Sequence, residues 1–180
     1  MLIQARTSTL LIIDIQERLF PAIHANASVL EHSAWLLGIA RRLGVPVLAT
    51  EQYPKGLGPT LPALRDELDE GELLEKVAFS AVNDPGLLQM PGGDRRQFVV
   101  CGTEAHVCVL QTVLGLLAAD REVFVVEEAL GSRRPQDKAL ALERMRQAGA
   151  VVVSREMVAF EWLERAGTEV FREISRQFIR

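Results

Sequence analysis

Short apolar runs that alternate with segments of helical period constrain the fold of this 180-residue chain more than any other feature. Six such runs, each of four or five residues, have the composition of buried strands: residues 9–13, 46–50, 73–76, 97–101, 122–126 and 150–153. This alternation is typical of βα units built around a parallel sheet. The sequence therefore predicts an α/β fold, with helices on both faces of one sheet.

Three segments between the runs have a helical period and recognisable ends. Residues 28–43 and 135–148 each stop at a glycine, and the second begins with a proline, as helices commonly do. Residues 107–119 follow the same pattern, and residues 159–180 are predicted to form one or two closing helices. A chain of this size can bury roughly 70% of its surface in one core, so we expect a single domain over residues 1–180.

Charge and cysteine content exclude several classes of partner. The formal net charge is -4 with mixed signs along the chain, so nucleic acid and anionic membranes are not expected partners, whereas small molecules are. No stretch reaches the ~20 apolar residues of a membrane helix, and the N-terminal apolar run continues into Asp14 as a first strand instead of forming a targeting signal. With only two cysteines, one of them (Cys101) within an apolar run, the sequence predicts a cytoplasmic protein.

Three reactive side chains follow the carboxyl ends of predicted strands. Asp14 follows the first run, Lys76 ends the third, and Cys108 opens the helix after the fourth. These ends face one crevice in an open parallel sheet, so we expect the three side chains to meet there. A helix N-terminus lowers the pKa of a thiol such as Cys108, and Asp14 can accept the thiol proton while Lys76 holds the resulting charges. Acyl transfer through a thioester follows, with backbone N–H groups at the start of the helix as oxyanion donors.

Each of these residues also has a purely structural interpretation. Asp14 with Glu17 has the spacing of a helix cap, and Lys76 alone has the pattern of a solvated cation at a strand end. Cys108, in the first turn of a helix, can simply pack under the sheet. Only their joint placement favours catalysis.

Other polar residues are candidates for smaller roles. His106 stands two residues from Cys108, and side chains two apart on a helix diverge, so we expect His106 to line the pocket instead of activating the thiol. Arg133 and Arg134 fit either a carboxylate-binding pair or an exposed helix start. The sequence contains no Asp-x-His or Cys-x-x-Cys pair and no glycine loop of dinucleotide spacing, so neither a metal nor a cofactor is expected.

Four segments together resemble the isochorismatase-like cysteine hydrolases, which include nicotinamidases and N-carbamoylsarcosine amidohydrolases. They are residues 11–16 (Leu-Ile-Ile-Asp-Ile-Gln), 75–80 (Glu-Lys, then Phe-Ser), 101–108 (Cys-Gly-Thr-Glu-Ala-His-Val-Cys) and 144–150 (Arg-Met-Arg-Gln-Ala-Gly-Ala). Residues 50–60 resemble the corresponding loop of isochorismatase domain-containing proteins within that family.

The resemblance implies a three-layer sandwich around a six-stranded parallel sheet in the order 3-2-1-4-5-6. It also implies a catalytic triad of Asp14, Lys76 and Cys108, and assembly into homo-oligomers, as dimers or larger. A non-proline cis peptide is implied between Thr103 and Glu104, which makes the N–H groups of Glu104 and Cys108 the candidate oxyanion hole.

Two departures from the family pattern narrow the expected activity. Nicotinamidases carry an Asp-x-His metal motif where this chain has Glu51-Gln52-Tyr53, so a metal-independent enzyme is expected. Isochorismatases proper need no cysteine nucleophile, whereas this chain has Cys108, which favours an amidase-like route.

We therefore expect a cytoplasmic cysteine hydrolase that acts on a small amide-like (C–N) substrate. The residues expected to shape its substrate pocket are Gln52, Tyr53, Phe79 and His106. The alternative is a non-enzymatic binding or assembly module that keeps the fold and the pocket, in which Cys108 would be inert.

Overall fold

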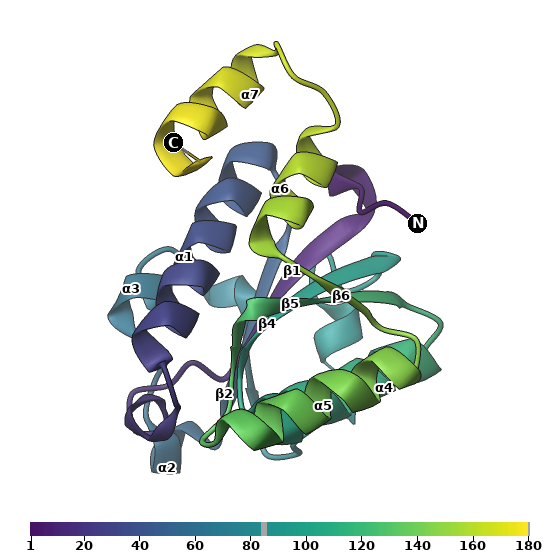
Figure 1. The fold of residues 1–180 in the computed structure, drawn as a ribbon. Coiled ribbons are helices and arrows are strands. Elements are labelled where there is room, and N and C mark those ends of the chain that lie inside the picture. Colours follow the sequence, from purple (N-terminus) through teal and green to yellow (C-terminus); the bar gives the residue numbers. More distant parts are fainter. Residues whose placement is uncertain (84–85, 180) are drawn as a thin grey trace.

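The computed structural model describes residues 1–83 and 86–179, and its centre is one six-stranded parallel sheet (Figure 1). The strands are β1 (Ser8–Ile13), β2 (Val47–Gln52), β3 (Leu73–Lys76), β4 (Gln97–Thr103), β5 (Glu122–Gly131) and β6 (Val151–Val153). Their order is β3-β2-β1-β4-β5-β6, and every pair is parallel. The expected α/β class and strand order are therefore confirmed.

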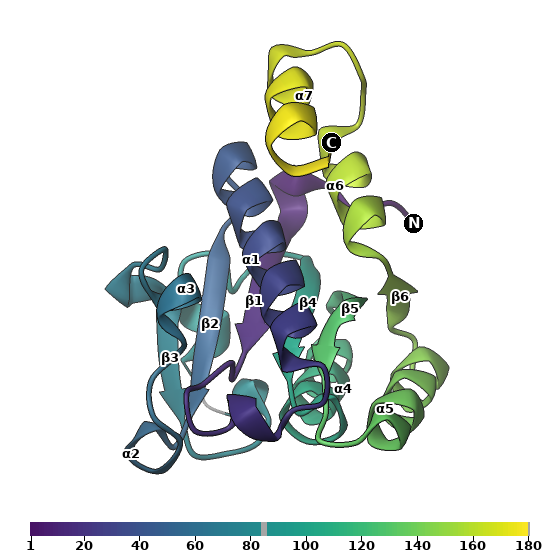
Figure 2. The same ribbon diagram turned by 60° about the vertical axis from the view of Figure 1, so that its left-hand side comes forward.

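Helices cover both faces of the sheet, which is the middle layer of a three-layer sandwich (Figures 1 and 2). They are α1 (Asn26–Leu43), α2 (Pro54–Leu57), α3 (Pro62–Arg65), α4 (Leu110–Ala118), α5 (Pro135–Gln147), α6 (Arg155–Leu163) and α7 (Glu169–Ile174). α1 and α6 pack on one face, and α4 and α5 on the other. No helix in residues 1–83 and 86–179 is both long enough and apolar enough to cross a bilayer.

The first strand shows why its sequence is a continuous apolar run. All six residues of β1 are buried, because alternate side chains enter the two cores on opposite faces of the sheet. Leu10 and Ile12 pack in the core beneath α1, whereas Leu11 and Ile13 pack in the core beneath α4. Burial on both faces leaves no polar side in the strand, which is the pattern of a central parallel strand.

The predicted strands are close to the observed ones except at their carboxyl ends. β5 continues five residues beyond the predicted end at Val126, through the charged pair Glu127 and Glu128. A register shift between Val100 and Gly102 on β4 lets β5 resume pairing at Leu130. β2 and β4 likewise extend two residues beyond their predicted ends, whereas β1 and β3 end at the predicted residues.

Gly102 permits a close approach between β4 and β1. Its φ of 129° is a glycine conformation, and a Cβ there would lie 2.1 Å from the carbonyl oxygen of Ile13. Ile13 pairs with Gly102 on one side and with Thr50 of β2 on the other. The carboxyl ends of β1, β2 and β4 are therefore held side by side just before Asp14.

The C-terminal segment forms the closing helices that the sequence predicts, but it starts earlier, at Arg155. Ser154 caps α6 by accepting a hydrogen bond from the Met157 N–H. After α7 a π-helical turn, Ser175–Ile179, returns to α1, where the Trp35 indole Nε1 donates to the Phe178 carbonyl at 2.7 Å.

Candidate active site

Asp14 and Lys76 form an ion pair that is completely removed from solvent. The Lys76 Nζ donates to Asp14 Oδ2 at 2.8 Å, and both side chains are 0% exposed. The Thr50 hydroxyl donates to the other carboxylate oxygen, Oδ1, at 2.6 Å. Asp14 is therefore no helix cap, and Lys76 is no solvated cation, so their structural interpretations from the sequence are wrong.

The Lys76 ammonium is fully surrounded by acceptors. Besides Asp14, it donates to Gln52 Oε1 at 2.6 Å and to the Phe79 carbonyl at 3.2 Å, with the Ala78 carbonyl at 3.4 Å. An ammonium group has three protons to donate. Each of them thus has a partner inside the protein, as burial of a charge requires.

Cys108 lies beside this pair, in a π-helical turn between β4 and α4. The turn spans Ala105–Val109, and Cys108 is only 2% exposed within it. Its Sγ is 3.9 Å from Gln52 Oε1, the atom that also accepts from Lys76. Single π-helical turns are frequently found at functional sites. The acid, the amine and the thiol are therefore gathered at one end of the sheet.

Burial raises the pKa of the Cys108 thiol to about 12, which is opposite to the lowered pKa expected at a helix N-terminus. Desolvation is the main cause, and the negative charge of Asp14 raises the pKa further, while the positive charge of Lys76 lowers it. The expectation was wrong because desolvation of the buried sulfur is the largest influence on its pKa. The thiol is consequently protonated at neutral pH.

Three residues that follow strands at this site have left-handed backbone conformations. They are Asp14 after β1, Tyr53 after β2 and Glu104 after β4, with φ of 50°, 38° and 39°. Such conformations cost about 1–3 kcal/mol each in residues other than glycine, and they cluster at functional sites. The strain therefore falls at Asp14 itself, directly after Gln52, and at the start of the turn that carries Cys108.

The cis peptide implied between Thr103 and Glu104 is absent, and no cis bond occurs in residues 1–83 and 86–179. The left-handed conformation of Glu104 makes the turn from β4 into the π-helical segment instead. Thr103 is anchored just before it, because its hydroxyl donates to the Asp14 carbonyl at 2.5 Å.

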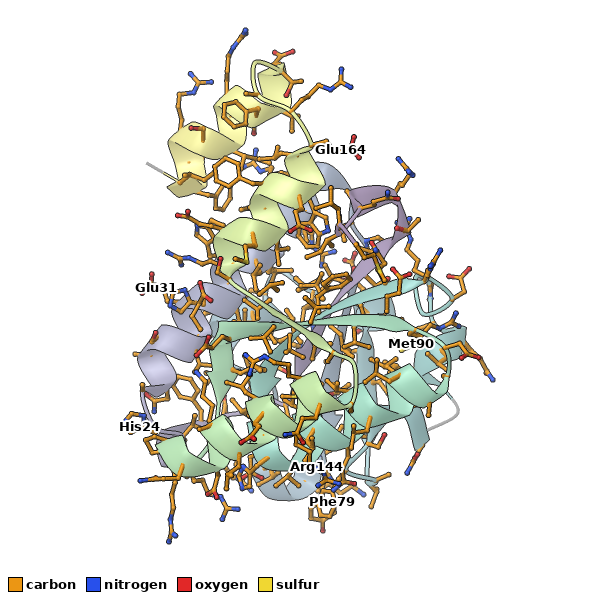
Figure 3. All side chains as sticks on the ribbon, turned by 45° about the vertical axis from the view of Figure 1, so that its right-hand side comes forward. His24, Glu31, Phe79, Met90, Arg144 and Glu164 are labelled. Carbon is orange, nitrogen blue, oxygen red and sulfur yellow. The ribbon has the colours of Figure 1, made fainter. Side chains whose placement is uncertain are left out.

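The residues predicted to shape a pocket have different environments. Gln52 is buried and both ends of its amide are bonded within the protein, the Nε2 to the Val77 carbonyl at 2.7 Å. Tyr53 and Phe79 are 55% and 53% exposed, and Phe79 projects from the edge of the molecule in Figure 3. His106 turns to Ser132, with Nδ1 and Oγ 3.0 Å apart.

Arg133, which the sequence left open, forms an ion pair with Glu104 at 2.7 Å. Arg134 occupies the N-cap position of α5, where no side-chain cap bond is made. Arg133 thus stabilises the turn before Cys108 from the end of β5.

Sequence reasoning missed Thr50, Thr103 and Gln16 as supports of the site. Gln16 clamps the end of β2: its Oε1 accepts from the Gln52 N–H at 2.8 Å, and its Nε2 donates to the Gln52 carbonyl at 3.0 Å. The same Nε2 donates to the Gly58 carbonyl at 2.7 Å, which ties down the loop after β2. Gln16 and Thr50 could have been identified from the sequence, because both lie in the segments that carry the family resemblance.

The three reactive residues are almost completely buried, with Asp14 0%, Lys76 2% and Cys108 2% exposed. None of them lines any of five cavities found among the described residues. A cavity of about 500 Å³ is lined by Ser132, residues of β5 and the starts of α1 and α5, and Ser132 also contacts His106 of the nucleophile turn. Within the described residues, no group of three or more His, Cys, Asp or Glu side chains is arranged to hold a metal ion.

Comparison with known proteins settles the family. The Isochorismatase domain matches residues 8–157. The chain belongs to the isochorismatase family. Human isochorismatase domain-containing protein 2 is 38% identical over 172 residues, which cover 94% of this chain and 82% of that protein.

Solved structures show the same fold. MAR1 ribonuclease from Caenorhabditis elegans is 32% identical with a TM-score of 0.89, covering 100% of this chain and 93% of its own. The YcaC gene product of Escherichia coli, described as an octameric hydrolase of unknown specificity, is 20% identical with a TM-score of 0.88, covering 99% of this chain and 91% of its own. Membership of the isochorismatase family supports a hydrolase.

Proposed function

We propose that this isochorismatase-family protein is a cysteine hydrolase that cleaves a small amide-like C–N bond through a thioester on Cys108. The observation that carries the proposal is the fully buried Asp14–Lys76 ion pair, whose ammonium shares the oxygen of Gln52 with the Cys108 thiol. A buried ion pair costs desolvation free energy, and removing one partner typically costs 3–5 kcal/mol. A buried acid and cation beside a thiol can take part in catalysis, which explains why the protein bears this cost.

The proposed reaction assigns one role to each group. Asp14 accepts the proton from the Cys108 sulfur, and the thiolate attacks the carbonyl carbon. Asp14 then returns the proton to the leaving nitrogen as the C–N bond breaks. A thioester remains on Cys108. Asp14 takes a proton from the water that attacks the thioester and passes it to the Cys108 sulfur as the C–S bond breaks, which releases the acid and restores the thiol. Lys76 stabilises the negative charges, and the N–H groups of Glu104 and Cys108 are the proposed donors to the oxyanion.

The high pKa of Cys108 favours this order of events. A thiol whose pKa is about 12 supplies almost no thiolate at neutral pH, so it needs a base during the attack itself. Asp14 is the carboxylate whose negative charge acts most strongly on the thiol. The site is thus suited to general-base catalysis and poorly suited to a preformed thiolate.

Recognition is assigned to the side chains that reach solvent near the triad. Tyr53 and Phe79 offer exposed aromatic faces at the ends of β2 and β3, and His106 borders the nucleophile turn. Gln52 has no free hydrogen-bonding end in the resting site, so its direct contact with substrate is not part of the proposal. Base, cation and nucleophile all come from the protein, so the proposed mechanism is metal-independent.

Two further features are proposed for the whole protein. We expect a homo-oligomer, because YcaC is octameric and because Tyr53, Val77 and Phe79 form an exposed apolar group beside the site. We also expect a reducing compartment such as the cytoplasm, since both cysteines are free.

The test is a screen of small amides, ureides and ring imides for release of ammonia or acid, with RNA included because one relative is named a ribonuclease. We expect turnover of a small amide-like compound and none of RNA, since the chain has a net charge of -4. Cys108→Ala should abolish turnover, and Cys101→Ala, which changes the other buried thiol, should keep it. A fully active Cys108→Ala variant would refute the mechanism, and an inert Cys108 without turnover would favour the non-enzymatic module.

A further inference from the structure

We propose that Gln52 is a positioning residue that holds the Lys76 ammonium away from the Cys108 sulfur in the resting enzyme. Its amide oxygen accepts a hydrogen bond from both groups, at 2.6 Å from Nζ and 3.9 Å from Sγ. Lys76 can therefore pair with a Cys108 thiolate only after this oxygen releases the ammonium. The inference rests on the proposed function, because it assigns Gln52 a part in the same reaction.

The orientation of the Gln52 amide is fixed from both sides. Its Nε2 donates to the Val77 carbonyl at 2.7 Å, so the oxygen must face Lys76 and Cys108. Gln16 holds the backbone N–H and carbonyl of the same residue at 2.8 and 3.0 Å. A side chain bonded at both ends on a clamped backbone is suited to hold a partner in one place.

The ammonium has no spare proton for the sulfur. Its three protons serve Asp14, Gln52 and the carbonyls that follow β3, as described above. The bond to Asp14 belongs to the ion pair, and the carbonyl contacts are longer, at 3.2 and 3.4 Å. Gln52 Oε1 is the acceptor that contacts both the ammonium and the sulfur. We therefore infer that Lys76 must leave this oxygen before it can pair with the sulfur.

Transfer of the thiol proton to Asp14 would drive this exchange. The sulfur becomes negative and the Asp14 carboxyl neutral, so the Lys76 ammonium is then attracted to the sulfur more strongly than to Asp14. The oxygen of Gln52, which accepted from the neutral thiol, then faces a negative sulfur and no longer stabilises it. The charged groups that act on the sulfur are Asp14 after β1, Lys76 of β3 and Glu104 before the π-helical turn.

Two substitutions of Gln52 that nearly keep its volume should shift the pKa of the Cys108 thiol in opposite directions. Gln52→Met removes the shared acceptor and frees the ammonium, which lowers the pKa of the thiol by about 1. Gln52→Glu places a negative charge beside the sulfur and raises it by about 1. A pKa change of about 1 changes the amount of thiolate about tenfold, but the nucleophilicity of a thiolate falls as its pKa falls and offsets part of this change. Alkylation at pH 8 should therefore be roughly 3-fold faster in the Met variant and roughly 3-fold slower in the Glu variant.

The experiment measures the iodoacetamide rate at Cys108 by peptide mass spectrometry, with the exposed Gln147→Met as a matched control that should leave the rate unchanged. Loosening of the fold would speed the reaction in both Gln52 variants, so rates that move the same way, or not at all, overturn the inference. Gln52→Met should also keep KM within about 2-fold, whereas a substrate-binding role would raise KM and leave the thiol rate unaltered. Turnover by Cys108→Ala would instead overturn the proposed function, whatever the Gln52 variants do.

Discussion

Replacing Asp14 with Asn should make Cys108 more reactive toward alkylation while abolishing turnover. Asn has the shape of Asp and retains an oxygen for the Thr50 hydroxyl, which donates to Oδ1 at 2.6 Å. It removes the negative charge that raises the pKa of the Cys108 thiol, and it leaves the positive charge of Lys76 unbalanced. Both changes favour the thiolate.

The expected size follows from the electrostatics of the site. A like charge within ~4–6 Å raises the pKa of a group by roughly 1–3, so Asp14→Asn should lower that of Cys108 by about 2. Thiolate then becomes about 100-fold more abundant at pH 8, and its nucleophilicity falls about 10-fold. Alkylation should therefore be about 10-fold faster than in the wild type. Turnover should fall by roughly 10²–10⁴, because the base is lost.

The assay compares iodoacetamide rates at Cys108 with turnover of the same preparations, after circular dichroism has confirmed that the variant is folded. Alkylation and turnover must move in opposite directions. If both fall together, Asp14 promotes thiolate formation in the resting enzyme, and the reasoning about a neutral thiol is refuted.

Three other predictions follow from the same contacts. Lys76→Met should lower the free energy of unfolding by about 3–5 kcal/mol in urea denaturation, because it leaves a buried carboxylate unpaired; a loss below about 0.5 kcal/mol would mean that the ion pair is open to water. Thr50→Val should cost about 1–2 kcal/mol in the same assay and reduce turnover, since Asp14 Oδ1 loses its donor; unchanged turnover would remove Thr50 from the site. The pKa of Cys108 is about 12 in the folded protein and 9.0 for a free thiol, so its stabilising effect is complete below pH 9 and is lost as pH rises toward 12. Wild type should thus lose roughly 1.4 kcal/mol per pH unit relative to Cys108→Ala between pH 9.5 and 11, and parallel curves would contradict the buried neutral thiol.

Much of the fold could be predicted because local and global signals agree. The run that forms β1 is apolar on both faces, as only a central parallel strand requires, and the α1 boundary at Gly44 is a left-handed glycine cap. The end of β5 could not be predicted in the same way. Between the pairs Val100–Val125 and Gly102–Leu130 lie one residue of β4 and four of β5, so Glu127 and Glu128 fall in an irregular stretch of β5 that no local pattern signals.

The candidate site was predictable as a set of residues but not as an environment. Strand ends locate Asp14, Lys76 and Cys108 at one edge of the sheet, whatever the details of packing. The raised pKa of Cys108 depends on how completely neighbouring side chains exclude water, which spacing does not encode. The roles of Gln16 and Gln52 likewise depend on hydrogen bonds between residues 36 positions apart.

The most direct measurement of the central claim is the mass of the intact protein, quenched with acid during steady-state turnover of an amide substrate. The proposed mechanism predicts an adduct equal to the substrate minus its leaving amine, mapped to Cys108 and absent from Cys108→Ala. Turnover by a Cys108→Ala variant, or an adduct on any other residue, would contradict it.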